Sequence, residues 1–500
     1  MNNFKRLTAV ILSLAMVFTV LTTNIFAADT QNDNRAQAIT DAEYMDSVRD
    51  LIRKEYNGTI FEDALNKAAT LKDMFKTLDK YSAFLTLDEF NSFIGSLSGS
   101  VEGVGITAEQ PEKDKYITIL KVYQNSPAWT AGVLSGDKIA EVDGQSVAGQ
   151  SIDVVVSKVK GAAGTKVKLG LIRQGVKDII TLEMPRAQID IPSVHYELRG
   201  NIGYILIDSF SDNTYSGVDE ALEYFDSKKV TRVVLDLRNN GGGYVDQAVQ
   251  VAERFVPKGL ITRLDYKDEE LPDESHYSSL TKLKYKLTVL VNENSASASE
   301  IFTGAVKDTK AGVIIGNKTF GKAKVQHFFP ILNKEAFIAL NQDSEVKSVN
   351  GYDFGYPFEN QLAGYGKMTV GLYYTPSGEC IDLKGIEPDV KVKDNEITED
   401  NIPVNFLEPT SVTVKPRLGT QYMDVFYTEC ILKLLNYNVD KPDITLDNKT
   451  FAAIKKFQKD NKLYSYGVLD FSTQKLLNSK LAALKQTKDP VYAKAALLLK

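Results

Sequence analysis

The stretch that decides the fold runs from Asn292 to Gln326 and reads NENSASASEIFTGAVKDTKAGVIIGNKTFGKAKVQ. It follows an apolar run, Leu287 to Val291, whose length and composition predict a buried strand. Apolar residues at helical spacing then predict a helix over 300–307, and the β-rich run 313–315 predicts a second strand. The serine cluster is therefore expected at a strand-to-helix corner, and Lys322 in the loop after the next strand.

Loops at the edge of an α/β sheet are where such folds assemble active sites, so this serine and lysine are a candidate nucleophile and base. A lysine accepts a proton only if its pKa falls from about 10.4 toward about 7–8. Burial beside Phe320, Val325 and Phe328 would lower the pKa, because desolvation penalises the ammonium form. Gln326 would orient the amine without adding a negative charge that raises the pKa again.

This stretch resembles the catalytic segment of the carboxyl-terminal processing peptidases, also called tail-specific proteases. In that family the middle serine of SASASE is the nucleophile, which corresponds to Ser297. The resemblance assigns the base to Lys322 and its amide partner to Gln326. The family's acidic residue corresponds to Asp308. Because a carboxylate near the lysine would raise its pKa, we expect Asp308 to be structural, with a catalytic role as the minor alternative.

The segment Arg238 to Gly243 (RNNGGG) resembles the family motif that supplies an oxyanion-hole N–H. The resemblance assigns that donor to Gly242 and pairs it with the N–H of Ala298, next to the nucleophile. Two positions depart from the family. Ala323 stands where Gly usually follows the lysine, which would be strained if the backbone there needs a positive φ. Gly241 stands where Pro is common, which predicts a more flexible loop.

From residue 99 to 186 the chain reads as short strands and turns. This part of the chain resembles a PDZ domain in the kind and spacing of three short segments. They are the glycine loop Gly103 to Ile106, Ser126-Pro127-Ala128 and Val142-Asp143-Gly144. Such a domain presents backbone N–H groups of its GxGI-type loop to a peptide carboxylate, while the peptide adds a strand to the sheet edge. The alternative is that Gly103 and Gly105 only form turns and bind nothing. The candidate carboxylate-binding residues are Gly103, Val104, Gly105 and Ile106.

The first residues predict export. Lys5 and Arg6 precede the apolar run 7–21, and Ala27 offers a small residue for cleavage, so residues 1–27 read as a signal peptide. We therefore expect an extracytoplasmic protein, secreted or associated with the cell wall. A retained membrane anchor is the alternative. Residues 28–98 are expected to form an N-terminal helical region, which the resembled family uses for packing and dimerisation, so we expect a homodimer.

The remaining chain predicts two further domains. Alternating strands and helices over 187–400 indicate the α/β peptidase core. A linker over 401–420 precedes 421–485, which resembles a small three-helix peptidoglycan-binding domain, although a generic helical bundle fits the same spacing. Residues 486–500 are treated as a tail. The expected fold class is α/β and α+β multidomain, with an N-terminal helical region, a PDZ domain, the serine-peptidase core and a small C-terminal helical domain.

Composition narrows the function. The 500 residues, a net charge of −6 and 25% charged residues describe several globular domains and give no electrostatic case for nucleic acid. Three scattered histidines give no metal-site spacing, and no cofactor is implied. Gly316 to Ala323 almost spells a phosphate-binding loop, but it lacks the Ser or Thr that would hold Mg²⁺.

We therefore predict an exported serine endopeptidase with a Ser–Lys dyad. It would cleave proteins near C-terminal or unstructured segments, with capture and gating by the PDZ domain. The alternative is a catalytically inactive, PDZ-bearing peptide-binding scaffold at the cell wall. No function is predicted for residues 331–366, which form a longer and more aromatic segment than the family leads us to expect.

Overall fold

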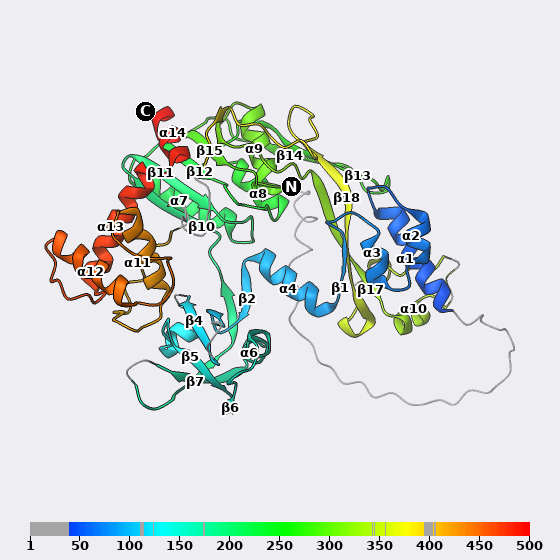
Figure 1. Ribbon diagram of the computed structural model, residues 1–500. Helices are drawn as coiled ribbons and strands as arrows, with labels where there is room; N and C mark the ends of the chain where they lie inside the picture. The colour runs from blue at the N-terminus through cyan, green and yellow to red at the C-terminus, as the bar shows by residue number, and fades with distance from the viewer. Residues whose placement is uncertain are drawn as a thin grey trace, which may run out of the picture. The chain divides into compact units, whose positions relative to one another are not determined.

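The computed structural model describes residues 40–110, 115–123, 125–173, 176–342, 344, 346–355, 357–394, 404 and 407–500. Asp41–Lys500 form one compact unit (Figure 1). The predicted signal peptide, 1–27, lies outside the described residues, as does the start of the predicted linker. Across the described ranges, no helix combines the length and the apolar character needed to cross a bilayer.

A six-stranded sheet carries the serine corner. Its order is β10-β11-β12-β15-β16-β19, with every neighbouring pair parallel except β10 and β11. The central strands are continuous apolar runs, which is typical of parallel strands buried on both faces. The strands are β10 (Val194–Arg199), β11 (Ile202–Ile207), β12 (Arg232–Asp236), β15 (Lys286–Val291), β16 (Gly312–Gly316) and β19 (Val390–Lys391). Their helices are α7 (Thr214–Ser227), α8 (Val245–Ala252) and α9 (Ala298–Asp308).

A second, antiparallel sheet carries the lysine loop. Its long strand β18 (Leu362–Tyr374) pairs on one side with β17 (Lys324–Leu332) and on the other with β1 (Ala83–Leu85) and β13 (Gly259–Tyr266). Strand β14 (Glu274–Ser278) completes the sheet beside β13. Figure 1 shows β17 and β18 running side by side. Among the described residues β17 has no strand partner other than β18, so it is an edge strand.

The N-terminal region is less uniformly helical than the sequence predicts. It forms α1 (Asp41–Glu55), α2 (Glu62–Lys67), α3 (Leu71–Lys76) and α4 (Leu87–Ser98), but β1 interrupts them. The prediction of helix throughout was wrong at β1 because its backbone pairs with β18, a partner far away in sequence. Helix α1 also packs on α10 (Lys334–Leu340) through the rings of Tyr44 and Phe337, and Tyr44 donates its hydroxyl to the carbonyl of Leu332 at the end of β17 at 2.8 Å.

Residues 100–190 form the expected small β domain. Its sheet has the order β3-β4-β5-β7-β8, with β6 beside β5, and its helices are α5 (Pro127–Ala131) and α6 (Ile152–Val159). The strands are β3 (Ile106–Glu109), β4 (Ile117–Val122), β5 (Lys138–Val142), β6 (Gln145–Ser146), β7 (Lys166–Ile172) and β8 (Ile180–Pro185). A separate ribbon pairs β2 (Ser100–Gly103) with β9 (Ala187–Asp190), so the two ends of the domain meet.

The C-terminal helices α11 (Met423–Leu434), α12 (Asn448–Asp460) and α13 (Phe471–Thr487) share a core of their own. The segment treated as a tail contains a further helix, α14 (Pro490–Leu498). Its apolar residues pack against the central strands of the six-stranded sheet. The sequence alone does not show this role because α14 is apolar nearly all round and gives no clear one-sided pattern. The contacting groups are Val491, Tyr492, Ala495 and Leu499 with Tyr204, Val234, Leu290 and Ile315.

Candidate active site

The candidate nucleophile Ser297 lies where the chain turns from β15 into α9. It is the N-cap of α9 and has φ 55° and ψ −117°, a conformation that residues other than glycine rarely adopt. Such strain persists only where the surroundings over-determine the backbone. Here Tyr373 donates its hydroxyl to the carbonyl of Ser297 at 3.1 Å, and Glu300 accepts the N–H of Ser297 at 3.0 Å. Ser297 is half-buried and lines a cavity of about 1400 Å³.

The carboxylate of Glu300 joins this corner to the lysine loop. It is fully buried and accepts four hydrogen bonds. One oxygen, Oε2, accepts the N–H groups of Ser297 and Lys322, at 3.0 and 2.9 Å. The other, Oε1, accepts the hydroxyl of Thr319 at 2.6 Å and the N–H of Gly321 at 2.7 Å. Burial raises the pKa of Glu300, while the four donors act in the opposite direction. The sequence analysis missed Glu300, although it closes the SASASE motif.

The predicted base, Lys322, points its amine at the predicted amide. Its Nζ donates to Oε1 of Gln326 at 3.2 Å, and Nε2 of Gln326 donates to the carbonyl of Tyr81 at 2.6 Å. The amine also lies 4.8 Å from the centre of the Tyr81 ring. Burial, followed by the positive charge of Lys367, lowers the pKa of Lys322. This is the direction that a lysine base requires. Sequence reasoning did not find Tyr81, which comes from the N-terminal region.

Ser297 and Lys322 line the same cavity, with Gln326 beside them. No hydrogen bond joins Oγ of Ser297 to Nζ of Lys322 in the described part of the chain; the amine donates to Gln326 instead. Catalytic hydrogen bonds are often long before substrate binds and tighten in the complex. The structure thus brings the three predicted catalytic side chains to one cavity. The hydrogen bond between Ser297 and Lys322 that proton transfer would need is not formed in it.

The predicted oxyanion donors lie against the corner but are unequally available. The N–H of Gly242 donates to Oδ1 of Asn240 at 2.9 Å, so it is engaged within its own loop. Ala298 opens α9, and the first N–H groups of a helix have no acceptor inside the helix. The carbonyl of Asn240 accepts from Ala296 N at 3.0 Å and from the hydroxyl of Ser299 at 2.9 Å, which holds the glycine loop against the corner.

Gly242 occupies a position that only glycine fits. Its φ is +107°, and a Cβ there would lie 2.7 Å from Cβ of Ser297 and 3.0 Å from the N of Ala298. Gly241, which replaces the family's proline, has open space around the same position and does not have a positive φ. Of these two glycines, only Gly242 therefore approaches Ser297 closely.

Two sequence-based concerns about the lysine loop are resolved by the backbone. Ala323 does not have a positive φ, so it carries no strain of that kind; the left-handed residue is Gly321, with φ 87°. The fragment that resembled a phosphate-binding loop leads into strand β17 rather than into a helix. The N–H of Gly321 is also taken by Glu300. A phosphate-binding loop needs both the helix and free N–H groups, so this segment is not one.

Asp308 lies apart from the cavity. It is the exposed last residue of α9 and accepts the N–H of Ser377 at 2.9 Å. Within the described residues, one group of three carboxylates, Glu429, Asp440 and Asp447, has oxygens within 4.8 Å of one another and could hold a cation. These three belong to the C-terminal bundle region and do not line the active-site cavity.

The predicted carboxylate-binding loop lines a second cavity, of about 310 Å³, between β3 and α6. Gly105 there has φ +83°, and a Cβ would lie 2.2 Å from Cβ of Ser126, so the loop needs glycine at this point. Apolar side chains dominate the rest of the lining, as a peptide-binding groove requires. The residues of the loop in this cavity are Gly103, Val104, Gly105 and Ile106.

A strained serine at a strand-to-helix corner and a half-buried lysine line one large cavity, which is the arrangement expected of a serine hydrolase. Comparison with known proteins makes the class specific. The model of peptidase family S41 matches residues 201–392, and that of a PDZ domain matches residues 118–173. The chain is 34% identical over 445 residues to a "Probable CtpA-like serine protease" of Staphylococcus haemolyticus, which covers 88% of this chain and 80% of the relative. A protein with the same description from Staphylococcus epidermidis is 31% identical over 484 residues, or 96% and 90% of the two chains.

The chain belongs to peptidase family S41 and carries a PDZ domain. The sequence predictions of the family, the enzyme class and the multidomain α/β fold are confirmed. Among solved structures, a photosystem II D1 C-terminal processing protease matches 71% of this chain and 94% of its own at 26% identity, with a TM-score of 0.41. A PDZ domain of a carboxy-terminal protease from Vibrio cholerae matches 18% of this chain and 97% of its own at 31% identity, with a TM-score of 0.17.

Proposed function

We propose that this protein is an exported serine endopeptidase in which Ser297 is the nucleophile and Lys322 the general base. The observation that carries this proposal is the shared carboxylate of Glu300, which fixes the backbones of both residues at the rim of one cavity. Gln326 holds the amine at 3.2 Å without adding a charge. The lowered pKa of Lys322 favours the neutral amine that a base requires.

The proton then follows a short path. The neutral amine of Lys322 takes the proton of the Ser297 hydroxyl as Oγ attacks the scissile carbonyl. The oxyanion accepts a hydrogen bond from the N–H of Ala298. It accepts a second one from the N–H of Gly242, once that N–H has released Oδ1 of Asn240. Lys322 next gives its proton to the leaving amine. The lysine afterwards activates the water that hydrolyses the acyl-enzyme.

The proposed substrates are proteins with accessible C-terminal or unstructured segments. The apolar cavity behind Gly103 and Gly105 would take the terminal residues of such a segment, and its occupancy would gate cleavage. Further parts of the proposal rest on the sequence: export on the signal-peptide pattern of residues 1–27, and peptidoglycan binding by the bundle over 421–485 and formation of a homodimer on resemblance. Each of these can be tested separately from catalysis.

One observation favours the inactive scaffold as a second candidate, namely the hydrogen bond that occupies the N–H of Gly242. The decisive experiment incubates the mature protein, and Ser297→Ala beside it, with an unstructured protein and identifies fragments by mass spectrometry. Cleavage by the parent alone supports the peptidase and its nucleophile together. Absence of cleavage by either protein would support the scaffold, and binding of peptides to the PDZ domain would then be measured.

A further inference from the structure

The free edge of β17 runs through the active-site cavity. Six consecutive residues of this strand, 324–329, line the cavity that Ser297 and Lys322 also line. Successive side chains of a strand point to opposite faces of the sheet, so one face alone would contribute only every second residue. A cavity that contacts six in a row must follow the edge of the strand, where the backbone itself is exposed.

The hydrogen bonds of β18 show which backbone groups face that edge. Thr369 is the partner of Gln326, yet its carbonyl accepts from Asn57 N at 2.7 Å and its N–H donates to Oγ of Ser82 at 3.2 Å. Thr369 therefore points both groups away from β17. In an antiparallel ladder the opposite residue of such a pair also points outward. The N–H and C=O of Gln326 thus face the cavity, and by alternation so do those of Phe328.

Two further positions confirm this alternation. Pro330, which has no N–H, falls in the same outward register, and proline in a sheet belongs where its nitrogen faces away from the ladder. Leu332, two residues further and past the register shift that follows Ile331, also donates its N–H outward, to the carbonyl of Val349 at 3.0 Å. The even-numbered residues from Gln326 to Leu332 therefore share one direction. Beside the catalytic lysine, this direction leads into the cavity.

Residues 349–351, within the segment that had no predicted function, close the far end of the edge. Asn350 forms an isolated bridge with Ile331, next to the Leu332–Val349 hydrogen bond. Gly351 is packed against Pro330: a Cβ added to this glycine would lie 3.2 Å from the carbonyl oxygen of Pro330. The unpaired edge consequently extends from Lys324 to Phe328. At about 3.3 Å per residue, it offers room for roughly five residues of extended chain.

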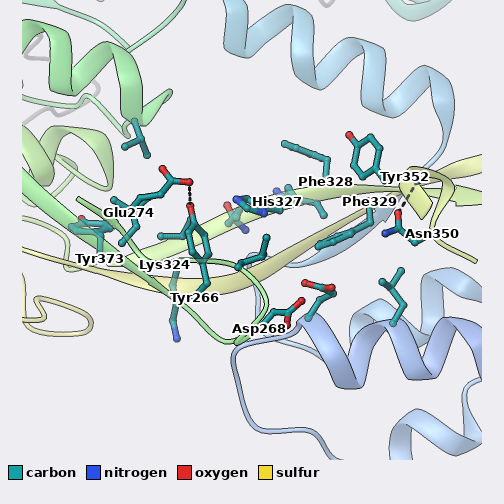
Figure 2. Close-up of a pocket in the computed structure, with 18 of the residues that line it drawn as sticks. Tyr266, Asp268, Glu274, Lys324, His327, Phe328, Phe329, Asn350, Tyr352 and Tyr373 are labelled. Atoms are coloured by element: carbon teal, nitrogen blue, oxygen red, sulfur yellow. Dashed lines mark hydrogen bonds between the residues drawn. The ribbon is translucent and has the colours of Figure 1, made fainter. Parts of the chain in front are cut away.

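Apolar and aromatic side chains flank the edge on both faces. On one face, Phe328 packs against Phe93 with ring centres 5.5 Å apart. On the other, Tyr266, His327 and Phe329 lie together, and Figure 2 shows them in the pocket. An occupant that pairs with the edge would therefore place successive side chains alternately against two walls that each carry aromatic rings.

We propose that an extended stretch of about five substrate residues adds to the edge of β17 as a further strand, and that residues 349–351 set the length of that stretch. The occupant is a polypeptide because the edge offers backbone donors and acceptors at strand spacing, which only another backbone matches throughout. Because the edge and Ser297 line the same cavity, we take the occupant to be the substrate. This inference rests on the proposed function and adds to it a docking strand, together with a role for the segment that had no predicted one.

The first test uses a fluorescent peptide that the parent enzyme cleaves at one mapped bond, with single N-methyl groups placed at successive residues. Pairing with an edge engages every second N–H of the added strand. We expect alternate methylations over about five residues to lower kcat/KM about ten-fold, and the intervening ones to have little effect. A uniform loss, or no loss outside the residues next to the scissile bond, would overturn the proposal.

Binding keeps the test independent of turnover. The same peptides are titrated against Ser297→Ala and followed by fluorescence anisotropy. The alternating pattern in Kd is expected there as well, whether or not the parent hydrolyses anything. Covalent labelling of Ser297 by a fluorophosphonate reports on the proposed function separately. Labelling without the alternating pattern removes the docking strand and leaves the peptidase.

Two matched variants isolate the edge N–H. Phe328→Ala removes the ring and keeps the backbone donor, whereas Phe328→Pro removes both. We expect Phe328→Pro to bind the peptide about ten-fold more weakly than Phe328→Ala, with equal fluorophosphonate labelling and equal Tm. Equal affinities in two folded variants would contradict the outward N–H of residue 328. If the proline variant fails to fold, the N-methyl series still decides.

Discussion

Glu300 and Lys322 are joined by a hydrogen bond of 2.9 Å between a buried carboxylate oxygen and a backbone N–H. The same oxygen accepts the N–H of Ser297. Two loops that follow the neighbouring strands β15 and β16 are thereby held through one atom. The relative placement of nucleophile and base consequently depends on a residue that contributes nothing to the chemistry itself.

Replacing Glu300 by Gln should therefore damage both activity and stability. The amide would turn an NH₂ group toward two of the four donors, which leaves buried donors unpaired. We expect kcat/KM to fall at least about 100-fold and the free energy of unfolding to fall by about 2 kcal/mol. Kinetics and urea unfolding provide the measurements. Glu293→Gln, an exposed change in the same loop, is the control. Parent-like activity of Glu300→Gln would contradict the claim that Glu300 fixes the placement of Ser297 and Lys322.

Lys322→Ala should remove turnover, by at least about 1000-fold, and leave the fold intact. The reason is that no other amine donates to Gln326 in the described residues. Circular dichroism and Tm check the fold, and fragment analysis by mass spectrometry checks activity. A folded Lys322→Ala that still cleaves at a comparable rate would exclude this lysine as the base.

The pH profile should respond to Lys367. Its positive charge lowers the pKa of Lys322, second in size to burial. The active form of Lys322 is neutral, so the rate rises as pH increases through that pKa. Lys367→Met removes the repulsion, which raises the pKa of Lys322 and moves the rising limb of kcat/KM to higher pH.

The comparison variant for this shift is Lys318→Met, which removes an exposed charge that pairs with Glu387 at 3.7 Å. It should leave the rising limb in place. A limb that moves to lower pH in Lys367→Met, or equally in both variants, would mean that a group other than Lys322 controls the profile.

Adjacent glycines should differ sharply. Gly242→Ala places a methyl group within 2.7 Å of Cβ of Ser297 at a φ of +107°, so the corner or the loop must move. We expect activity to fall at least about 100-fold. Gly241→Ala meets open space and should change kcat only several-fold. Steady-state kinetics of the two variants, with Tm for each, is the measurement. Similar losses in both would show that loop flexibility matters more than close approach.

Helix α14 should contribute to stability through Asp489. This carboxylate is buried and receives two hydrogen bonds from Arg238, at 3.1 and 2.7 Å. Asp489→Ala leaves part of a buried guanidinium unpaired and should cost about 3 kcal/mol. Thermal unfolding checks this. Asp460→Ala, an exposed partner of Lys456, is the control and should leave Tm nearly unchanged. A small loss for Asp489→Ala would indicate that Asp236 and Asp394 satisfy Arg238 alone.

Much of the site could be predicted because its signals are local. The apolar run before Asn292 and the small residues after it predict a strand and a corner, which places Ser297 correctly. The role of Glu300 could not be predicted in the same way, because three of its four donors come from 319–322 and meet it only in the folded chain. Strand β1 was missed for a related reason: three residues become a strand only through pairing with β18.

Arg238 also sets an order of events during synthesis. It lies 251 residues before Asp489, yet the two are fully buried against each other behind the glycine loop. A chain that emerges from its N-terminus must hold this guanidinium without one of its carboxylates until residue 489 has been made. The glycine loop that follows Arg238 is thus secured only after α14 has begun to form, so the proposed site is completed at the end of synthesis.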